Sequence, residues 1–99
     1  MKMMRDLGQI QQMLSERRAD MARVFHVRSL AVFGSYARNE QLHDSDVDIL
    51  VEFDAPVGVE FIDLANYLED LLKIRVDLVS RNGIKPKYFR KIQPDLKYV

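Results

Sequence analysis

Three aspartates lie where extended segments would bring their carboxylates together. Asp46 and Asp48 open an otherwise apolar run at residues 46–53. Because side chains two apart in a strand point to the same face, these two carboxylates project together. Asp77 interrupts a second segment with strand character at residues 74–79. If that strand pairs beside the first, the third carboxylate faces the same pocket.

The chemistry that suits such acids is binding of a divalent cation. Placing carboxylates in an apolar strand costs free energy unless a partner compensates their charge, and two carboxylates close together repel each other. Mg²⁺ prefers oxygen ligands and commonly takes one or two carboxylates plus phosphate oxygens. Three carboxylates on adjacent strands can hold two ions, which clamp the attacking and leaving oxygens of a phosphoryl displacement. We therefore expect Asp46, Asp48 and Asp77 to bind metal, with solvated acids at a strand start as the alternative.

A Gly-Ser pair after the preceding apolar run supplies a candidate phosphate site. Gly34 lets the main chain approach a bound group closely. Ser35 is predicted to cap a short helix at residues 35–38, whose free N–H groups and dipole attract anions. A phosphate held there would meet the metal ions from the other side. Arg38, one turn on, is predicted either to contact phosphate or to pair with an acid.

The apolar periodicity predicts alternating helices and strands. The expected order is helix, strand, helix, strand, helix, strand, helix, at residues 3–25, 27–33, 35–38, 46–53, 59–73, 74–79 and 86–92. This order indicates an α/β (α+β) chain with a small mixed sheet of three to four strands flanked by helices. With 99 residues, we expect a single domain spanning positions 1–99.

Composition excludes several other classes of protein. Lys plus Arg and Asp plus Glu both number 15, so global charge gives no argument for nucleic-acid binding. The absence of Cys excludes disulfides, thiol catalysis and thiolate metal sites, and suits a reducing cytoplasm. No apolar run approaches the roughly 20 residues of a membrane span. We expect a cytoplasmic protein without membrane contact.

The motif resembles a known superfamily. Gly34-Ser35, ten further residues and Asp46-Val47-Asp48 is the spacing of the nucleotidyltransferases related to DNA polymerase beta. The fuller string GSYAR…SDVDILV resembles the minimal nucleotidyltransferases (MNT), which are the antitoxins of bacterial and archaeal HEPN/MNT toxin–antitoxin pairs. The resemblance covers roughly residues 30–79 and implies the nucleotidyltransferase fold.

This resemblance implies a role for each motif residue. Asp46 and Asp48 match the metal ligands. Asp77 matches the third acid, which holds a metal and helps to deprotonate the attacking hydroxyl. Gly34 and Ser35 match the turn that binds the triphosphate.

One position departs from the family pattern. Asn39 stands where these minimal enzymes often have Gly after the Arg. Asn tolerates left-handed dihedral angles better than most residues, so the departure bears on the shape of the loop rather than on the chemistry.

The function implied by the resemblance is that of a type VII-like antitoxin. Such an enzyme uses Mg²⁺, with two ions expected, to transfer AMP from ATP to a tyrosine hydroxyl of a cognate HEPN ribonuclease toxin, releasing pyrophosphate. The implied partners are the toxin, in a hetero-oligomer, and ATP, without direct nucleic-acid binding. Two alternatives stay open: an inactive antitoxin that neutralises its toxin by binding alone, and a nucleotidyltransferase acting on RNA or a small molecule.

Overall fold

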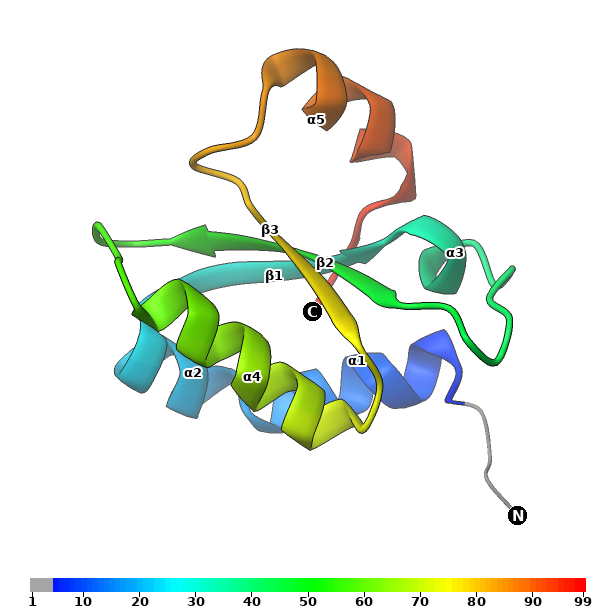
Figure 1. Cartoon of the computed structure of the whole chain (residues 1–99), viewed down its shortest axis with the longest axis horizontal. Coiled ribbons are helices and arrows are strands. Elements are labelled where there is room, and N and C mark those ends of the chain that lie inside the picture. Colours follow the sequence, from blue (N-terminus) through cyan, green and yellow to red (C-terminus); the bar gives the residue numbers. More distant parts are fainter. Residues whose placement is uncertain (1–4) are drawn as a thin grey trace.

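The chain forms a sheet with helices on both faces (Figure 1). The structure is a computed structural model that describes residues 5–99. Its elements, in chain order, are α1 (Leu7–Glu16), α2 (Arg18–Phe25), β1 (Val27–Phe33), α3 (Gly34–Ala37), β2 (Val47–Phe53), α4 (Glu60–Leu72), β3 (Val76–Ser80), α5 (Pro86–Ile92), the 3₁₀ helix η1 (Gln93–Asp95) and β4 (Lys97–Tyr98). No helix within this part of the chain is long and apolar enough to span a bilayer.

The sheet is mixed and has the strand order β3-β2-β1-β4. β1 pairs antiparallel with both β2 and β4, whereas β2 and β3 are parallel. A parallel pair needs a crossover, which α4 provides. The predicted α/β (α+β) class with a mixed sheet of three to four strands is therefore confirmed. The fourth strand, β4, has only two residues, too few to leave an alternating pattern in the sequence.

The two faces of the sheet bury separate cores because successive strand residues point to opposite sides. Val47, Ile49 and Val51 of β2 pack in the larger core with the buried leucines of α4. Leu50, between them, packs in the smaller core with Ile92 of α5. Figure 1 shows α1, α2 and α4 on one side of the sheet and α5 on the other. Asp48 shares the face of Leu50 and so lies on the α5 side.

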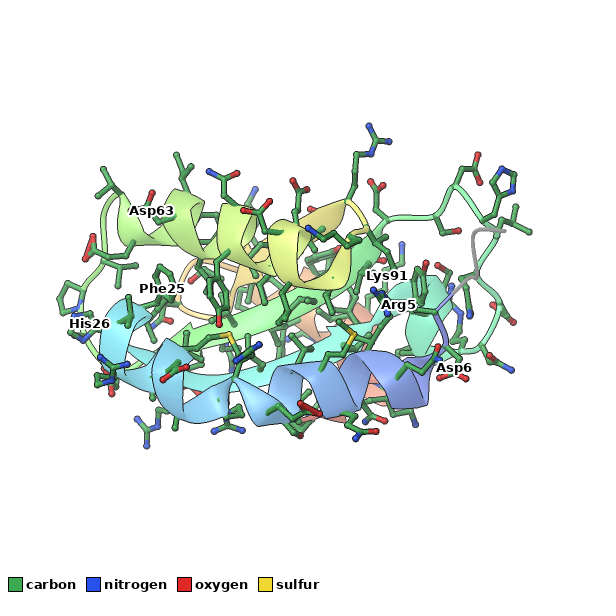
Figure 2. The ribbon with its side chains drawn as sticks, turned by 90° about the horizontal axis from the view of Figure 1, so that it is seen from below. Arg5, Asp6, Phe25, His26, Asp63 and Lys91 are labelled. Atoms are coloured by element: carbon green, nitrogen blue, oxygen red, sulfur yellow. The ribbon has the colours of Figure 1, made fainter. Side chains whose placement is uncertain are left out.

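Aromatic packing closes the larger core at its edge. Seen from below, Phe25 at the end of α2 points toward α4 (Figure 2). Its ring centroid lies 5.3 Å from that of Tyr67, in a tilted arrangement that suits two aromatic rings. This contact ties α2 to the crossover helix, which in turn connects the two parallel strands.

The N-terminal helix differs from the prediction of one helix at residues 3–25, of which residues 3 and 4 lie outside the described part. The structure has two helices, separated at Arg17, whose φ is −108° and ψ is 3°. The apolar stripe of Ile10 and Leu14 would continue at positions 17 and 18, but both are arginine. Arg18 instead donates to main-chain oxygens of Arg28 and of the C-terminal residue. The break therefore falls where the buried face lacks an apolar side chain.

The larger core predicts a clear difference between two residues of α4. Leu68 is fully buried, whereas 63% of Ile62 is exposed. We expect Leu68→Ala to lower the free energy of unfolding by about 2–5 kcal/mol, because it leaves a cavity. Ile62→Ala on the same helix should change it by no more than about 0.5 kcal/mol. Urea unfolding measures both, and equal losses would contradict the assignment of the buried face.

Candidate active site

The structure places Asp48 and Asp77 side by side on the α5 face of the sheet. They are register partners in the parallel strands β2 and β3. The Asp77 carboxylate lies close enough to Asp48 to raise the pKa of the Asp48 carboxyl. We call Asp48 and Asp77 the carboxylate pair. The strand pairing thus brings together two of the acids that the sequence singled out.

The carboxylate pair is strained electrostatically. The pKa of Asp48 is raised from its ordinary 3.8 to about 6. Partial burial is the largest cause, the neighbouring carboxylates of Asp77 and then Asp46 also contribute, and the charge of Arg38 acts in the opposite direction. Near neutral pH, two negative charges are held together in a partly desolvated place, an arrangement that a bound cation would relieve.

Gly34 lies directly against this pair. Its φ is +72°, in the left-handed region, and a Cβ at this position would lie 2.1 Å from the Asp48 Oδ2 atom. Phe33, the preceding residue, pairs with Asp48 across β1 and β2, which explains the close approach. Only glycine fits here, for both the backbone conformation and the space. The turn after β1 and the carboxylate pair therefore form one site.

Asp46, the third predicted acid, has a different neighbour. It precedes β2, which begins one residue later than predicted, and its Oδ1 atom lies 3.3 Å from Nε of Arg75. Within residues 5–99, no group of three or more His, Cys, Asp or Glu side chains is arranged to hold a metal ion. The structure therefore brings Asp48 and Asp77 together and leaves Asp46 beside them in an ion pair.

Ser35 is not the helix cap that the sequence predicted. The cap of α3 is Phe33, without a side-chain hydrogen bond, and Ser35 is the second residue of the helix. The extended backbone of Phe33 and the left-handed Gly34 start the turn one residue earlier than a serine cap would. Ser35 still lies next to Gly34, at the end of the helix where amides lack intrahelical partners.

Arg38 is engaged by two carboxylates. Its Nε lies 2.8 Å from Glu40, and its Nη1 lies 2.6 Å from Asp95 of η1. These hydrogen bonds, to Glu40 first and then to Asp95, raise the pKa of Arg38 further. Of the two roles predicted for Arg38, the structure has the ion pair. The next residue, Asn39, has φ 58°, so it takes the left-handed conformation that glycine would supply in the family pattern.

The residues at this site fit a hard divalent cation such as Mg²⁺. Asp46, Asp48 and Asp77 offer only carboxylate oxygens, which this ion prefers, and one or two carboxylates suffice when phosphate and water complete its shell. The missing Cβ of Gly34 lets the Asp48 carboxylate lie directly against the main chain of the turn. A cation bound there would also remove the repulsion within the carboxylate pair.

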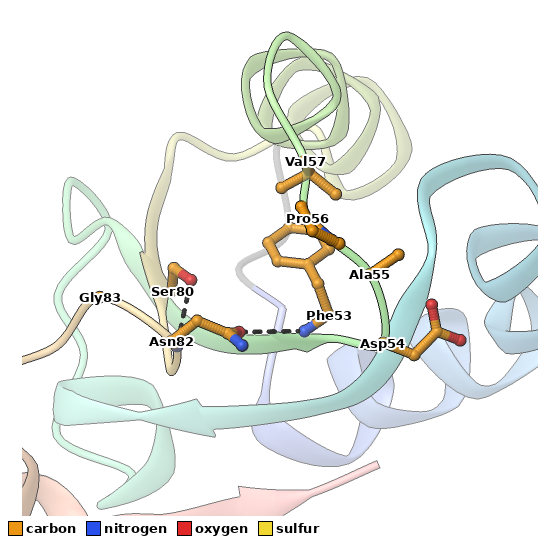
Figure 3. Close-up of a pocket in the computed structure, with 8 residues that line it drawn as sticks. All are labelled: Phe53, Asp54, Ala55, Pro56, Val57, Ser80, Asn82 and Gly83. Atoms are coloured by element: carbon orange, nitrogen blue, oxygen red, sulfur yellow. Dashed lines mark hydrogen bonds between the residues drawn. The ribbon is translucent and has the colours of Figure 1, made fainter.

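A hollow of about 550 Å³ lies at the other end of the same two strands (Figure 3). It is lined by Phe53 and Ser80, the last residues of β2 and β3, and by the loops that follow them. None of the predicted site residues lines it, and Asn82 uses its side-chain oxygen there to accept from the Phe53 amide. This hollow is therefore separate from the carboxylate pair.

Arg75 is a residue at the site that the sequence analysis did not single out. It belongs to the string Arg75-Val76-Asp77, which repeats the spacing of Asp46-Val47-Asp48. In parallel strands, two strings with the same spacing place their first and last residues opposite each other. That shared spacing is the signal that could have identified Arg75.

Comparison with known proteins defines the class. The family profile described as "Nucleotidyltransferase domain" matches residues 12–98. The chain therefore belongs to the nucleotidyltransferase family and is a nucleotidyltransferase. The protein adenylyltransferase MntA of Thermococcus cleftensis is 42% identical over 94 residues, which cover 94% of this chain and 95% of that protein. A chain of Methanocaldococcus jannaschii is 43% identical over 98 residues, covering 97% of this chain and all of the relative.

Solved structures share the fold. One described as a minimal nucleotidyltransferase has a TM-score of 0.75 at 29% identity and covers 97% of this chain and 98% of its own. A toxin–antitoxin structure with AMP-PNP has a TM-score of 0.70 at 23% identity, covering 84% of this chain and 69% of that one. The nucleotidyltransferase fold predicted from the motif spacing is thus confirmed.

The contact between Gly34 and Asp48 predicts a specific effect of substitution. Gly34→Ala should lower the free energy of unfolding by about 1–3 kcal/mol. Alanine is unfavourable in the left-handed conformation of this position, and its Cβ would displace the Asp48 carboxylate. Gly83→Ala is the matched control, because a Cβ there has no neighbour within 4 Å. In an Asp48→Ala background, Gly34→Ala should lower the free energy of unfolding by less, because only the unfavourable backbone conformation remains. Chemical denaturation measures all four variants, and an undiminished loss in that background would contradict the contact.

The raised pKa of Asp48 predicts a dependence of stability on pH. Because its folded pKa of about 6 exceeds the ordinary 3.8, its stabilising contribution is complete below pH 3.8 and is lost as pH rises through about 6. In EDTA, Asp48→Asn should therefore gain stability relative to the parent between pH 4 and pH 7. Because solvent screens this partly exposed group, we expect the free energy of unfolding of the variant to rise by about 1 kcal/mol relative to the parent. A difference between the two proteins that does not vary with pH would contradict this.

Proposed function

We propose that this chain, as a single minimal nucleotidyltransferase domain, is a Mg²⁺-dependent protein adenylyltransferase. Its substrate would be ATP, and its acceptor a tyrosine hydroxyl on a cognate HEPN ribonuclease toxin. The chain would thereby act as the antitoxin of a type VII-like pair in the cytoplasm, in a hetero-oligomer with that toxin. The observation that carries the proposal is the carboxylate pair packed against Gly34.

The relatives support the choice of acceptor and nucleotide. The Thermococcus cleftensis relative is named as a protein adenylyltransferase. One structural neighbour is a toxin–antitoxin structure with AMP-PNP, an ATP analogue. Another, with a TM-score of 0.64 at 22% identity, is a tri-AMPylated HEPN toxin of Shewanella oneidensis in complex with its MNT antitoxin. Transfer of AMP to a partner protein is therefore the reaction we assign to this chain.

In this proposal, the two sides of the site have different tasks. Asp46, Asp48 and Asp77 hold the cations, and Gly34 with Ser35 holds the triphosphate. Bound Mg²⁺ would supply neutralisation of the phosphate charge and of the charge that develops during transfer. Arg38 turns toward phosphate if its pairs with Glu40 and Asp95 open. Catalysis is then mainly positioning and electrostatic stabilisation, as in other phosphoryl transfers.

The transfer itself is a displacement at the α-phosphorus of ATP. The tyrosine oxygen forms a bond to the α-phosphorus. The bond between the α-phosphorus and the oxygen that bridges it to the β-phosphate breaks, so pyrophosphate leaves. The phenol proton passes to Asp77, which is exposed at the edge of the sheet and can reach an incoming hydroxyl. Asp48, beside it, is more buried and serves to bind rather than to accept this proton.

The sequence alternatives differ in what they require of this site. An antitoxin that acts by binding alone needs no carboxylate pair. A transferase acting on RNA needs a surface that attracts and stacks a nucleic acid, which the zero net charge does not favour. A small-molecule acceptor needs a pocket beside the acids, whereas the hollow of Figure 3 lies at the far end of the strands.

Labelled ATP tests the proposed reaction. The chain, Mg²⁺ and its neighbouring gene product should give a toxin whose intact mass increases by whole AMP units. The Asp48→Asn/Asp77→Asn variant should slow this transfer about 10³-fold or more, because it removes the groups that hold the ions. Asp63→Asn/Asp70→Asn is the matched control, since it removes two exposed acids from α4 on the other face. Intact-mass spectrometry of the toxin gives the rate.

Three results would contradict the proposal. Label on added RNA or on a small molecule, rather than on the toxin, would assign a different acceptor. An unmodified toxin that the chain still silences would indicate neutralisation by binding. Full protection of cells by the Asp48→Asn/Asp77→Asn variant would show that transfer is not how the chain acts.

A further inference from the structure

A second row of side chains lies next to the carboxylate pair and includes a positively charged arginine. Val47 and Val76 are register partners in the parallel strands, so the residues just before them, Asp46 and Arg75, lie opposite each other. The Arg75 Nε atom is 3.3 Å from Asp46 Oδ1. Because positions two apart share a face, this row and the carboxylate pair form a square of three acids and one arginine.

The main chain of Arg75 is fixed, whereas its side chain is free to move. Its carbonyl accepts from the Val47 amide at 2.9 Å. The next amide, of Val76, donates to the Glu69 carboxylate of α4 at 2.9 Å. Yet 81% of the Arg75 side chain is exposed. The guanidinium can therefore leave Asp46 by rotation of its own bonds, without any change in the sheet.

This ion pair accounts for the incomplete cluster of acids. Among the described residues, the three predicted acids do not form a group able to hold a metal ion. Asp48 and Asp77 lie opposite each other as register partners, and Asp46 has the arginine as its counter-ion. A cation that binds Asp46 meets the Arg75 guanidinium as a rival counter-ion on that carboxylate.

We propose that Arg75 is the counter-ion of Asp46 in the cation-free site and competes with the divalent cation for that carboxylate. This inference rests on the proposed function, because it takes the three acids as the cation site. Arg75 is thus a positioning residue that acts through Asp46. When the cation binds, it replaces the guanidinium as the counter-ion of Asp46.

We expect a moderate effect on cation affinity, because Arg75 is largely exposed and Asp46 is about half exposed, and such ion pairs are weak. Replacing Arg75 by glutamine removes the competitor and a positive charge near the incoming ion. Both changes favour the cation, so its dissociation constant should fall about two- to tenfold. Tighter cation binding distinguishes this prediction from general damage to the site, which would weaken binding.

Mn²⁺ binding to the nucleotide-free chain tests the proposal, with free Mn²⁺ measured by electron paramagnetic resonance. Arg75→Gln is compared with the parent and with Arg23→Gln. Arg23 is the matched control because it forms a similar pair with Asp20, at 3.1 Å with 74% of its side chain exposed, on the other face of the sheet. Arg75→Gln should bind Mn²⁺ about two- to tenfold more tightly than the parent, and Arg23→Gln should bind as the parent does.

A second pair of variants tests whether the competition is for Asp46. In an Asp46→Asn background, Arg75→Gln should tighten binding by a clearly smaller factor, because the two residues are coupled. An equal factor in both backgrounds would overturn the proposal, as would unchanged or weaker binding by Arg75→Gln in the parent. These results would leave the cation site itself intact. If the parent binds no Mn²⁺, or Asp48→Asn/Asp77→Asn binds it equally well, the proposed function fails together with this inference.

Discussion

Two carboxylates that strand register forces together are the constraint on which this structure depends. Asp48 and Asp77 lie opposite each other in parallel strands, and neither can move away without a change of register. A one-residue shift would expose the whole apolar set of β2, so the core of the protein maintains the repulsion. The raised pKa of Asp48 expresses that repulsion together with burial. A bound cation would relieve that repulsion, which is why we propose the pair as a cation site.

The other elements can be understood from their relation to this pair. The crossover helix α4 makes the parallel pairing possible and buries three leucines against the sheet. On the opposite face, α5 covers Leu50, the apolar neighbour of Asp48 on that face, while the acids stay accessible to solvent. The turn at Gly34 brings main chain, rather than a side chain, against the Asp48 carboxylate. The larger core thus lies on one side of the sheet, and the site that we propose lies on the other.

The sequence predicted the parts of the site that depend on strand periodicity and on a motif of fixed spacing. Asp48 and Asp77 were identified from strand alternation and an assumed pairing of the two strands, and Gly34 from the spacing of the motif. The pairing of Asp46 with Arg75 was missed, although it follows from the same strand pairing and from the shared spacing of the two strings. The break at Arg17 and the two-residue β4 depend on tertiary packing, and the predicted cap at Ser35 was wrong because Gly34 starts the helix earlier.

We expect a divalent cation to bind at the carboxylate pair, beside the turn at Gly34. Relaxation of amide resonances by Mn²⁺, added in trace amounts to the ¹⁵N-labelled chain, locates the ion directly. The account predicts selective broadening at Gly34, Ser35, Asp48 and Asp77, reversed by excess Mg²⁺. Broadening centred instead on the acidic outer face of α4, at Glu60 and Asp63, with these four signals unchanged, would contradict it.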